Sequence, residues 1–253
     1  MDSGRSGAGA LGRWTDAVSA ARDGNKKKTM SGTEQTHEGR APRVLVIGAS
    51  RGIGLETVRL ALASGYRVRG FSRSVGDVAL DHPRFEAHAG DALEGRELRA
   101  ALAGVDAVVQ SLGVRAGPRM VLRRTYLFSE ATDELVRAMG GTGVRRLITV
   151  TGYGAGASYA HLKCHERLPF RAALGRVYDD KSRQEAVIER SSLDWTIVRP
   201  GILLNGSTIG PYRVLDNSAD WRLGCLNRAE VADFLVAQLK DTRFLRRAVT
   251  LCR

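Results

Sequence analysis

An apolar run that leads directly into a glycine-rich turn constrains the fold of this chain more than any other feature. Val44–Ile47 is a continuous aliphatic segment, as expected for a strand that is buried on both faces of a parallel sheet. Three glycines follow at once, at Gly48, Gly52 and Gly54, and apolar residues then recur at helical spacing over 55–62. This segment therefore predicts a strand, a tight turn and a helix, in that order.

The alternation of strands and helices continues to the end of the chain. Apolar runs predict further strands over 66–72, 85–89, 107–110, 146–151, 195–199 and 248–251. Helices are predicted over 98–102, 131–139, 180–191 and, from a capping box of Asn227 and Glu230, 227–239, with a long loop before Asp180. This alternation predicts an α/β fold, a single-domain Rossmann-type doubly wound parallel sheet with helices on both faces, over 41–253.

Residues 1–40 differ from the rest of the chain in composition. They are rich in Gly, Ser, Thr and charge and have no sustained apolar period, so we expect a disordered N-terminal extension. Two alternatives stay open. One is a mitochondrial presequence with an amphipathic segment over 14–22, although Asp2, Asp16 and Asp23 are unusual in a transit peptide. The other is a start at Met30, which would leave the residues before it outside the native protein.

Composition excludes several classes of protein. Of the 253 residues 43% are hydrophobic, which is enough for a sizeable core, and no apolar run is long enough to span a membrane. The three cysteines, Cys164, Cys225 and Cys252, are far apart and odd in number, which predicts a reduced, cytoplasmic protein. The net charge of +12 fits nucleic acid, an anionic small molecule or solubility alone, but with only 6% aromatic residues we do not expect nucleic-acid binding.

The glycine turn predicts a site for a dinucleotide. Glycine is needed where φ is positive and where the backbone must approach a ligand closely, and the N–H groups that open the next helix face a pyrophosphate. The expected contacts come from Gly48, Ser50, Arg51, Gly52, Ile53 and Gly54. A turn that only packs, without a ligand, is the alternative.

The end of the second predicted strand distinguishes the two nicotinamide cofactors. An NAD enzyme presents Asp or Glu there to the ribose hydroxyls, about twenty residues after the turn. This chain has Ser72, Arg73 and Ser74 instead, so we expect NADP(H), with Arg73 and Arg51 binding the 2′-phosphate. Alternatively one of the two is only a solvated surface arginine, for which Arg51 in its exposed turn is the better candidate.

These segments resemble the short-chain dehydrogenase/reductases, and more closely their atypical NmrA-like and biliverdin reductase B-like branch. The resemblance covers about residues 43–251. It rests on 48–54, 90–91, 111–113, Lys181 with Glu185, 196–201 and 228–232. The glycine spacing departs from this branch, because three residues and then one separate the glycines, as in the main family, whereas atypical members more often have two and two.

The resemblance implies an NADPH-dependent oxidoreductase that transfers hydride to a small organic acceptor such as a carbonyl, quinone or flavin. A non-catalytic NADP-binding sensor or scaffold of NmrA type is the alternative. The resemblance also implies cofactor contacts: Asp91, next to Ala92, reaches the adenine, Leu112 and Gly113 line the nicotinamide side, and the segment from Pro200 to Ile202 covers the nicotinamide.

The catalytic residues follow less directly. In the main family a Ser, a Tyr and a Lys four residues after the Tyr transfer the proton, but here Val177 stands four residues before Lys181 and Tyr178 stands three before it. We expect Lys181 to bind the ribose, Tyr178 or Tyr153 to donate a proton, and Thr151 to orient the substrate oxygen. The alternatives are a surface ion pair between Lys181 and the glutamate four residues later, and proton supply by water.

Two basic segments, both expected as loops, lie at the same edge of the predicted sheet. One contains Arg115, Arg119, Arg123 and Arg124, and the other runs over 161–176. Either they bind an anionic substrate or they are solvated charged loops. The cluster of His161, Cys164, His165 and Glu166 lacks a second ligand pair, so we expect no metal.

The oligomeric state is not predicted. Trp221 and Leu223 are expected to be exposed, where they could form an interface between subunits or cover the cofactor cleft.

Overall fold

The structure, a computed structural model, describes residues 41–114, 126–206 and 208–253. They belong to one compact unit, Ala41–Arg253. The expected extension over 1–40 and the first basic segment, with Arg115, Arg119, Arg123 and Arg124, lie outside the described residues.

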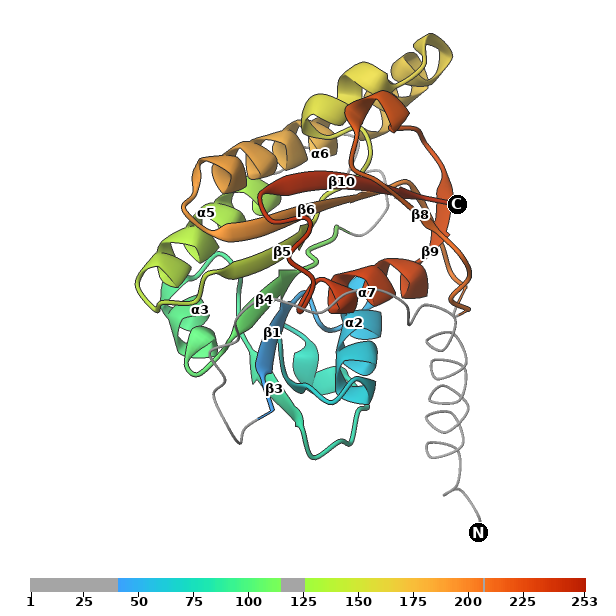
Figure 1. The fold of residues 1–253 in the computed structure, drawn as a ribbon. Coiled ribbons are helices and arrows are strands. Elements are labelled where there is room, and N and C mark those ends of the chain that lie inside the picture. The colour runs from blue at the N-terminus through green and yellow to red at the C-terminus, as the bar shows by residue number, and fades with distance from the viewer. Residues whose placement is uncertain (1–40, 115–125, 207) are drawn as a thin grey trace. The chain divides into compact units, whose positions relative to one another are not determined.

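An eight-stranded sheet forms the centre of this unit (Figure 1). In spatial order its strands are β3 (Phe85–Ala89), β2 (Arg67–Ser72), β1 (Arg43–Ile47), β4 (Ala107–Gln110), β5 (Arg146–Val150), β6 (Asp194–Pro200), β10 (Arg247–Cys252) and β8 (Arg213–Leu215). All neighbours are parallel except β8, which pairs antiparallel with β10. The predicted Rossmann-type, doubly wound sheet is confirmed. Because the strand order reverses between β1 and β4, a ligand crevice is expected at their carboxyl ends.

Helices cover both faces of the sheet (Figure 1). On one face α3 (Gly95–Leu102), α5 (Leu127–Gly140) and α6 (Cys164–Arg190) pack side by side, and on the other α2 (Gly52–Ala63) packs against α7 (Arg228–Ala237). The first face encloses a core that includes Leu45, Leu98, Leu135, Leu147 and Ile188, each fully buried. Val44 and Val46 on β1 are buried outside this core, and burial on both faces of the sheet explains why the central strands are continuous apolar runs.

Several predicted elements have the expected bounds. The strands over 85–89 and 107–110 are β3 and β4, and the capping box before α7 is present, since the N–H of Asn227 donates to the Glu230 carboxylate at 2.8 Å. The first helix ends at Ala63, and Gly65 follows with a φ of +93°, which suits a helix stop.

The loop expected before Asp180 is wrong, because α6 begins at Cys164. Its first turn is fixed by the N–H of Lys163, which donates to the Glu166 carboxylate at 2.9 Å. Most side chains of its first ten residues are exposed, so this part of the helix has no apolar period that could reveal it in the sequence. The second basic segment, over 161–176, is therefore mostly helix, with Pro169 inside it.

Short elements after β6 were not expected from the sequence. A separate two-stranded parallel sheet pairs β7 (Ile202–Leu204) with β9 (Cys225–Asn227). Three short 3-10 helices complete the described unit: η2 (Val75–Asp77), η3 (Gly156–His161) and η4 (Ser218–Asp220). Strands of three residues are too short for a periodic sequence signal. The pairing of β7 with β9 nevertheless matters for the site, because it places the start of α7 beside β7.

Candidate functional site

The glycine turn is held between two strands. The N–H of Gly48 donates to the carbonyl of Phe71 on β2 at 2.8 Å. Gly48 has a φ of +85°, and a Cβ atom there would overlap the carbonyl oxygen of Ser111, which follows β4. A side chain is therefore excluded at this position by both the backbone conformation and the space.

The other two glycines shape the start of α2. A Cβ on Gly54 would overlap the carbonyl oxygen of Gly48, so this glycine lets the helix pack directly against the turn. Gly52 has a φ of +60° and faces open space, since the nearest atom to a Cβ built there is the Nε of Arg228 at 3.8 Å. Arg51, the N-cap residue, makes no side-chain capping bond to the first N–H groups of α2. This open, N–H-lined cradle fits a pyrophosphate.

A cleft of about 1500 Å³ opens at the carboxyl ends of the central strands. It exceeds the roughly 300–1,000 Å³ of most small-molecule sites, which leaves room for a dinucleotide and a second molecule. The predicted site residues that line it are Gly48, Ser50, Arg51, Gly52, Ile53, Arg73, Asp91, Ala92, Leu112, Gly113, Thr151, Tyr178, Lys181, Pro200 and Ile202. Gly54 and Tyr153 are not among its lining residues.

Two arginines stand at the β2 end of the cleft. Arg51 is exposed, and the Arg73 side chain is 79% exposed with its Nη1 at 3.9 Å from a carboxylate oxygen of Asp91. The Asp91 backbone is fixed because its N–H donates to the Glu97 carboxylate at 2.7 Å. Exposed ion pairs contribute little free energy, so Arg73 can exchange Asp91 for a more strongly charged partner.

Lys181 lies at the other end of the cleft, where it is almost completely buried. Its Nζ donates to the carbonyl of Thr151 at 2.8 Å and lies 4.3 Å from the centre of the Phe128 ring. Burial lowers the pKa of Lys181 to about 8, although Glu185 and Asp180 favour its charged form. A surface pair between Lys181 and Glu185 is wrong, because Lys181 is buried and Arg199 engages the glutamate.

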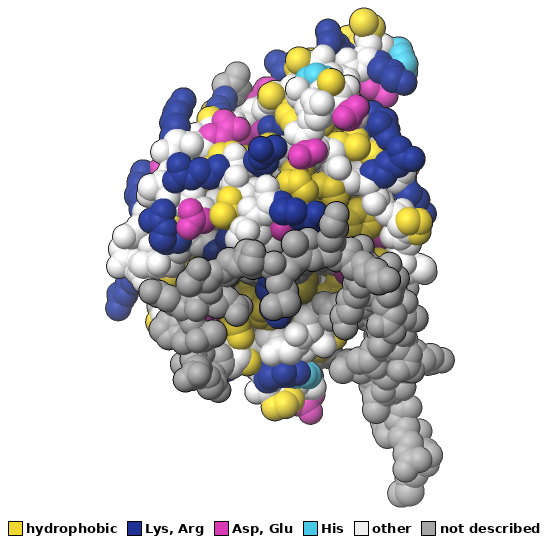
Figure 2. All heavy atoms as spheres, in the orientation of Figure 1, with side chains coloured by type: hydrophobic (Ala, Val, Ile, Leu, Met, Phe, Trp, Pro, Cys, Tyr) yellow, Lys and Arg dark blue, Asp and Glu magenta, His cyan; other side chains and the backbone are white. Residues whose placement is uncertain are grey.

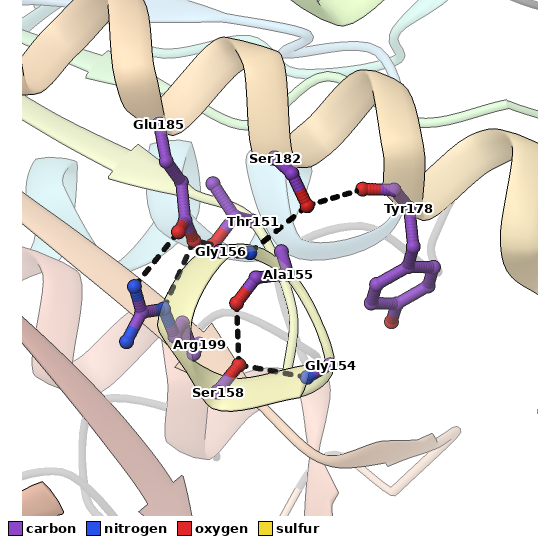
Figure 3. A network of polar contacts seen from close by, with 9 residues as sticks. All are labelled: Thr151, Gly154, Ala155, Gly156, Ser158, Tyr178, Ser182, Glu185 and Arg199. Atoms are coloured by element: carbon purple, nitrogen blue, oxygen red, sulfur yellow. Dashed lines mark hydrogen bonds and ion pairs between the residues drawn. The ribbon is translucent and has the colours of Figure 1, made fainter. Parts of the chain in front are cut away.

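A buried network fixes Thr151 (Figure 3). Arg199 on β6 donates from Nε and Nη2 to the two carboxylate oxygens of Glu185, at 3.0 and 2.7 Å. The Thr151 hydroxyl donates to the same carboxylate at 2.6 Å. The Arg199 guanidinium lies 4.7 Å from the ring centre of Trp221, which is therefore half-buried and not exposed as expected. Both oxygens of Thr151 are committed, the hydroxyl to Glu185 and the carbonyl to Lys181.

The two candidate tyrosines have different surroundings. Tyr178 lines the cleft, its ring meets Phe170 edge-on at 4.6 Å, and burial raises its pKa to about 12. In Figure 3 this ring points away from the Glu185 network. Tyr153 is 2% exposed, and its hydroxyl donates to the carbonyl of His161 at 3.0 Å. The structure thus places only Tyr178 at the cleft, because the Tyr153 hydroxyl is used to hold the chain before α6.

Two further cleft residues, Arg228 and Phe128, are not among the predicted site residues. Arg228 opens α7, and its Nη1 donates to the carbonyl of Leu204 at 3.2 Å and to the side chain of Asn205. Its segment, 228–232, carries part of the family resemblance, which was the available signal. Phe128 lies under Lys181 because the carboxylate of Asp180 accepts its N–H at 2.9 Å, a contact between α5 and α6 that no local pattern reveals.

Other kinds of site find no support in the described ranges. No group of three or more His, Cys, Asp or Glu side chains there could hold a metal ion. None of the helices within those ranges is long and apolar enough to cross a bilayer. On the face that Figure 2 shows, basic side chains are spread out with acidic and apolar ones between them.

Comparisons with known proteins agree with this geometry. The family model described as NAD(P)H-binding matches residues 48–242. An anaerobilin reductase, ChuY from Escherichia coli O157:H7, is 25% identical over 84% of this chain and 97% of that one, with a TM-score of 0.66. A short-chain dehydrogenase/reductase from Veillonella parvula, solved in complex with NADP, shares 18% identity over 85% of this chain and 95% of that one, with a TM-score of 0.70.

A relative in sequence is sterol demethylase protein B of Methylococcus capsulatus, which is 32% identical over 66% of this chain. The match spans only about half, 52%, of that protein's length. The expected likeness to atypical, NmrA-like and biliverdin reductase-like oxidoreductases is confirmed by the family model and these neighbours. With the family model matched over most of its length, and with a glycine turn and cleft of the corresponding form, this chain belongs to the NAD(P)H-binding family.

Proposed function

We propose that the protein is an NADPH-dependent reductase that reduces a small organic acceptor in the cleft between the glycine turn and Lys181. One observation carries the proposal. A dinucleotide cradle and a buried lysine beside a tyrosine line one continuous cleft. The family to which the chain belongs supports NAD(P)H as the cofactor.

Arginines at the β2 end favour NADPH over NADH. Arg73 and Arg51 line the cleft there, and the position at the end of β2 that would offer a carboxylate to ribose hydroxyls carries Ser72 and Arg73. Arg73 pairs with the Asp91 carboxylate at 3.9 Å. A 2′-phosphate would draw Arg73 from it, because charge-assisted bonds to a phosphate are stronger than an exposed pair.

The chain's own groups would position the reactants. When bound, the nicotinamide supplies the hydride. Lys181 retains two N–H donors beyond its bond to Thr151 and can hold ribose hydroxyls with them. Leu112, Gly113 and Pro200 also line the cleft and would pack against the nicotinamide.

Tyr178 is the proposed proton donor. A tyrosine hydroxyl is protonated at neutral pH, and burial, which raises the pKa of Tyr178 to about 12, does not change this, so the proton is available to a substrate oxygen that gains negative charge. Thr151 already donates its hydroxyl proton to Glu185, so it can only accept a further bond. We therefore assign Thr151 a positioning role, exerted on Lys181 through its carbonyl.

Part of the cleft wall is apolar. Val114, Leu127, Phe128, Leu174 and Val177 are among its lining residues, and the Phe128 ring lies 4.3 Å from the Lys181 Nζ. Such a lining suits a conjugated or aromatic acceptor such as a quinone or flavin better than a strongly charged compound.

Oxidation of NADPH in the presence of quinones, flavins and aldehydes tests the proposal, with binding of NADPH measured separately. Turnover with at least one acceptor is expected. Binding without turnover across the whole panel would refute the reductase and favour the non-catalytic sensor or scaffold. Val177, at the position where the main family has its catalytic tyrosine, favours that second function.

A further inference from the structure

Arg228 lies beside the glycine turn and lines the same cleft. It is the first residue of α7, whose start is fixed by the capping box and by the pairing of β7 with β9. Its Nε is 3.8 Å and its Cδ 3.9 Å from the place where a Cβ on Gly52 would lie, which makes Arg228 the neighbour nearest to the open side of that glycine.

Two neutral acceptors hold the Arg228 side chain in this position. Its Nη1 donates to the carbonyl of Leu204, the last residue of β7, and to the side-chain oxygen of Asn205, which follows it. Neither Nε nor Nη2 has a hydrogen-bond partner within the described ranges. No carboxylate there forms an ion pair with Arg228. Glu56 also lines the cleft, but its carboxylate pairs with Arg59 at 2.8 Å.

A cation at this place complements what the glycine turn provides. The turn and the start of α2 offer neutral N–H groups, whereas a pyrophosphate carries two negative charges that these groups do not neutralise. A guanidinium held by neutral acceptors keeps its full charge and presents its free N–H groups in a planar fork that matches phosphate oxygens.

We propose that Arg228 binds the pyrophosphate of the nicotinamide dinucleotide from its position beside Gly52. This inference rests on the proposed function, because it takes the cleft as the cofactor site. It gives Arg228 a role distinct from that of Arg73 and Arg51. Those two face the 2′-phosphate, which NADPH has and NADH lacks, whereas the pyrophosphate is common to both nucleotides.

The test compares dissociation constants for NADPH and NADH, measured by calorimetry without any acceptor. Arg228→Gln removes the charge, and the loss of charge-assisted bonds is expected to weaken binding of both nucleotides by a similar factor, roughly 10- to 100-fold. The ratio of the two constants should stay that of the wild type. Arg73→Ala should instead change the ratio. Arg222→Gln is the matched control, since Arg222 is exposed and outside the cleft lining.

Arg228→Lys retains the charge without the planar fork and should recover part of the lost affinity for both nucleotides. The proposal fails if Arg228→Gln binds both nucleotides within about twofold of the wild type, if only NADPH binding weakens, or if the lysine variant binds no better than the glutamine variant. In these cases a wild type that still binds NADPH leaves the reductase proposal intact. A wild type that binds neither nucleotide overturns both.

Discussion

Replacing Glu185 by an uncharged residue should clearly lower the melting temperature (Tm) of the protein. The side chains of Arg199 and Glu185 are 1% and 2% exposed, and two hydrogen bonds join them. The Nη1 of Arg199 is buried and has no hydrogen-bond partner in the part of the chain that the structure describes, so the guanidinium depends on this carboxylate. Glu185→Gln keeps the shape of the side chain but leaves a buried, uncompensated cation.

The expected cost follows from this burial. Breaking a buried ion pair by changing one partner costs about 3–5 kcal/mol, because the desolvated charge that stays behind loses its counterion. For a unit of this size, each kcal/mol lowers Tm by about 2–4 °C, which gives a fall of roughly 6–20 °C. Asp133→Asn is the control, since it breaks an ion pair with Arg137 whose side chains are 44% and 63% exposed, and it should cost less than about 1 kcal/mol.

Thermal unfolding followed by circular dichroism measures both variants, and a double variant completes the comparison. Glu185→Leu with Arg199→Met removes both charges, so it should be more stable than Glu185→Gln alone. If Glu185→Gln melts within about 2 °C of the wild type, or if the double variant is the less stable of the two, the charge left on Arg199 is not the source of the destabilisation.

Four further variants test the candidate site residues. Arg73→Ala should lower the preference for NADPH over NADH by roughly tenfold or more, and an unchanged ratio of dissociation constants would contradict the assignment of Arg73. Because burial lowers the pKa of Lys181 to about 8, the unfolded state binds more protons than the folded state between about pH 8 and 10, so this group makes stability rise with pH in that window. Lys181→Met should remove that rise when Tm is measured at both ends of the window, and an unaltered pH dependence would exclude Lys181 as its source. Tyr178→Phe should reduce turnover roughly 10²- to 10⁴-fold with little change in the NADPH dissociation constant. Tyr153→Phe should lower Tm but preserve turnover, since the Tyr153 hydroxyl bonds to the His161 carbonyl. If turnover instead falls in Tyr153→Phe and is preserved in Tyr178→Phe, Tyr153 is the proton donor.

The part of the fold that could be predicted has strong local signals. Val44–Ile47 and the glycines after it carry their structure in adjacent residues, because burial on both faces requires apolar side chains and positive φ requires glycine. The first turns of α6 lack such a signal, since their side chains are exposed on most sides and their start depends on the contact between Lys163 and Glu166. The sequence therefore predicts the sheet and the turn but not the length of α6.

The site residues also fall into two groups, those with a local sequence signal and those without one. Residues next to strand ends, such as Arg73 and Thr151, could be placed at the cleft because parallel strands end at one edge. Arg228 and Phe128 reach the cleft through contacts between distant segments, the pairing of β7 with β9 and the bond from Phe128 to Asp180. No pattern within one segment encodes these contacts.

The bond between Asp180 and the start of α5 has a mechanical consequence. The Asp180 carboxylate accepts the N–H groups of Phe128 and Ser129, at 2.9 and 3.3 Å, and the next residue, Lys181, lies over the Phe128 ring. Two consecutive residues of α6 thus fasten the first turn of α5 to the middle of α6. The cleft wall near Lys181 behaves as a single piece made of two helices, so widening this end of the cleft requires both helices to slide together over the sheet.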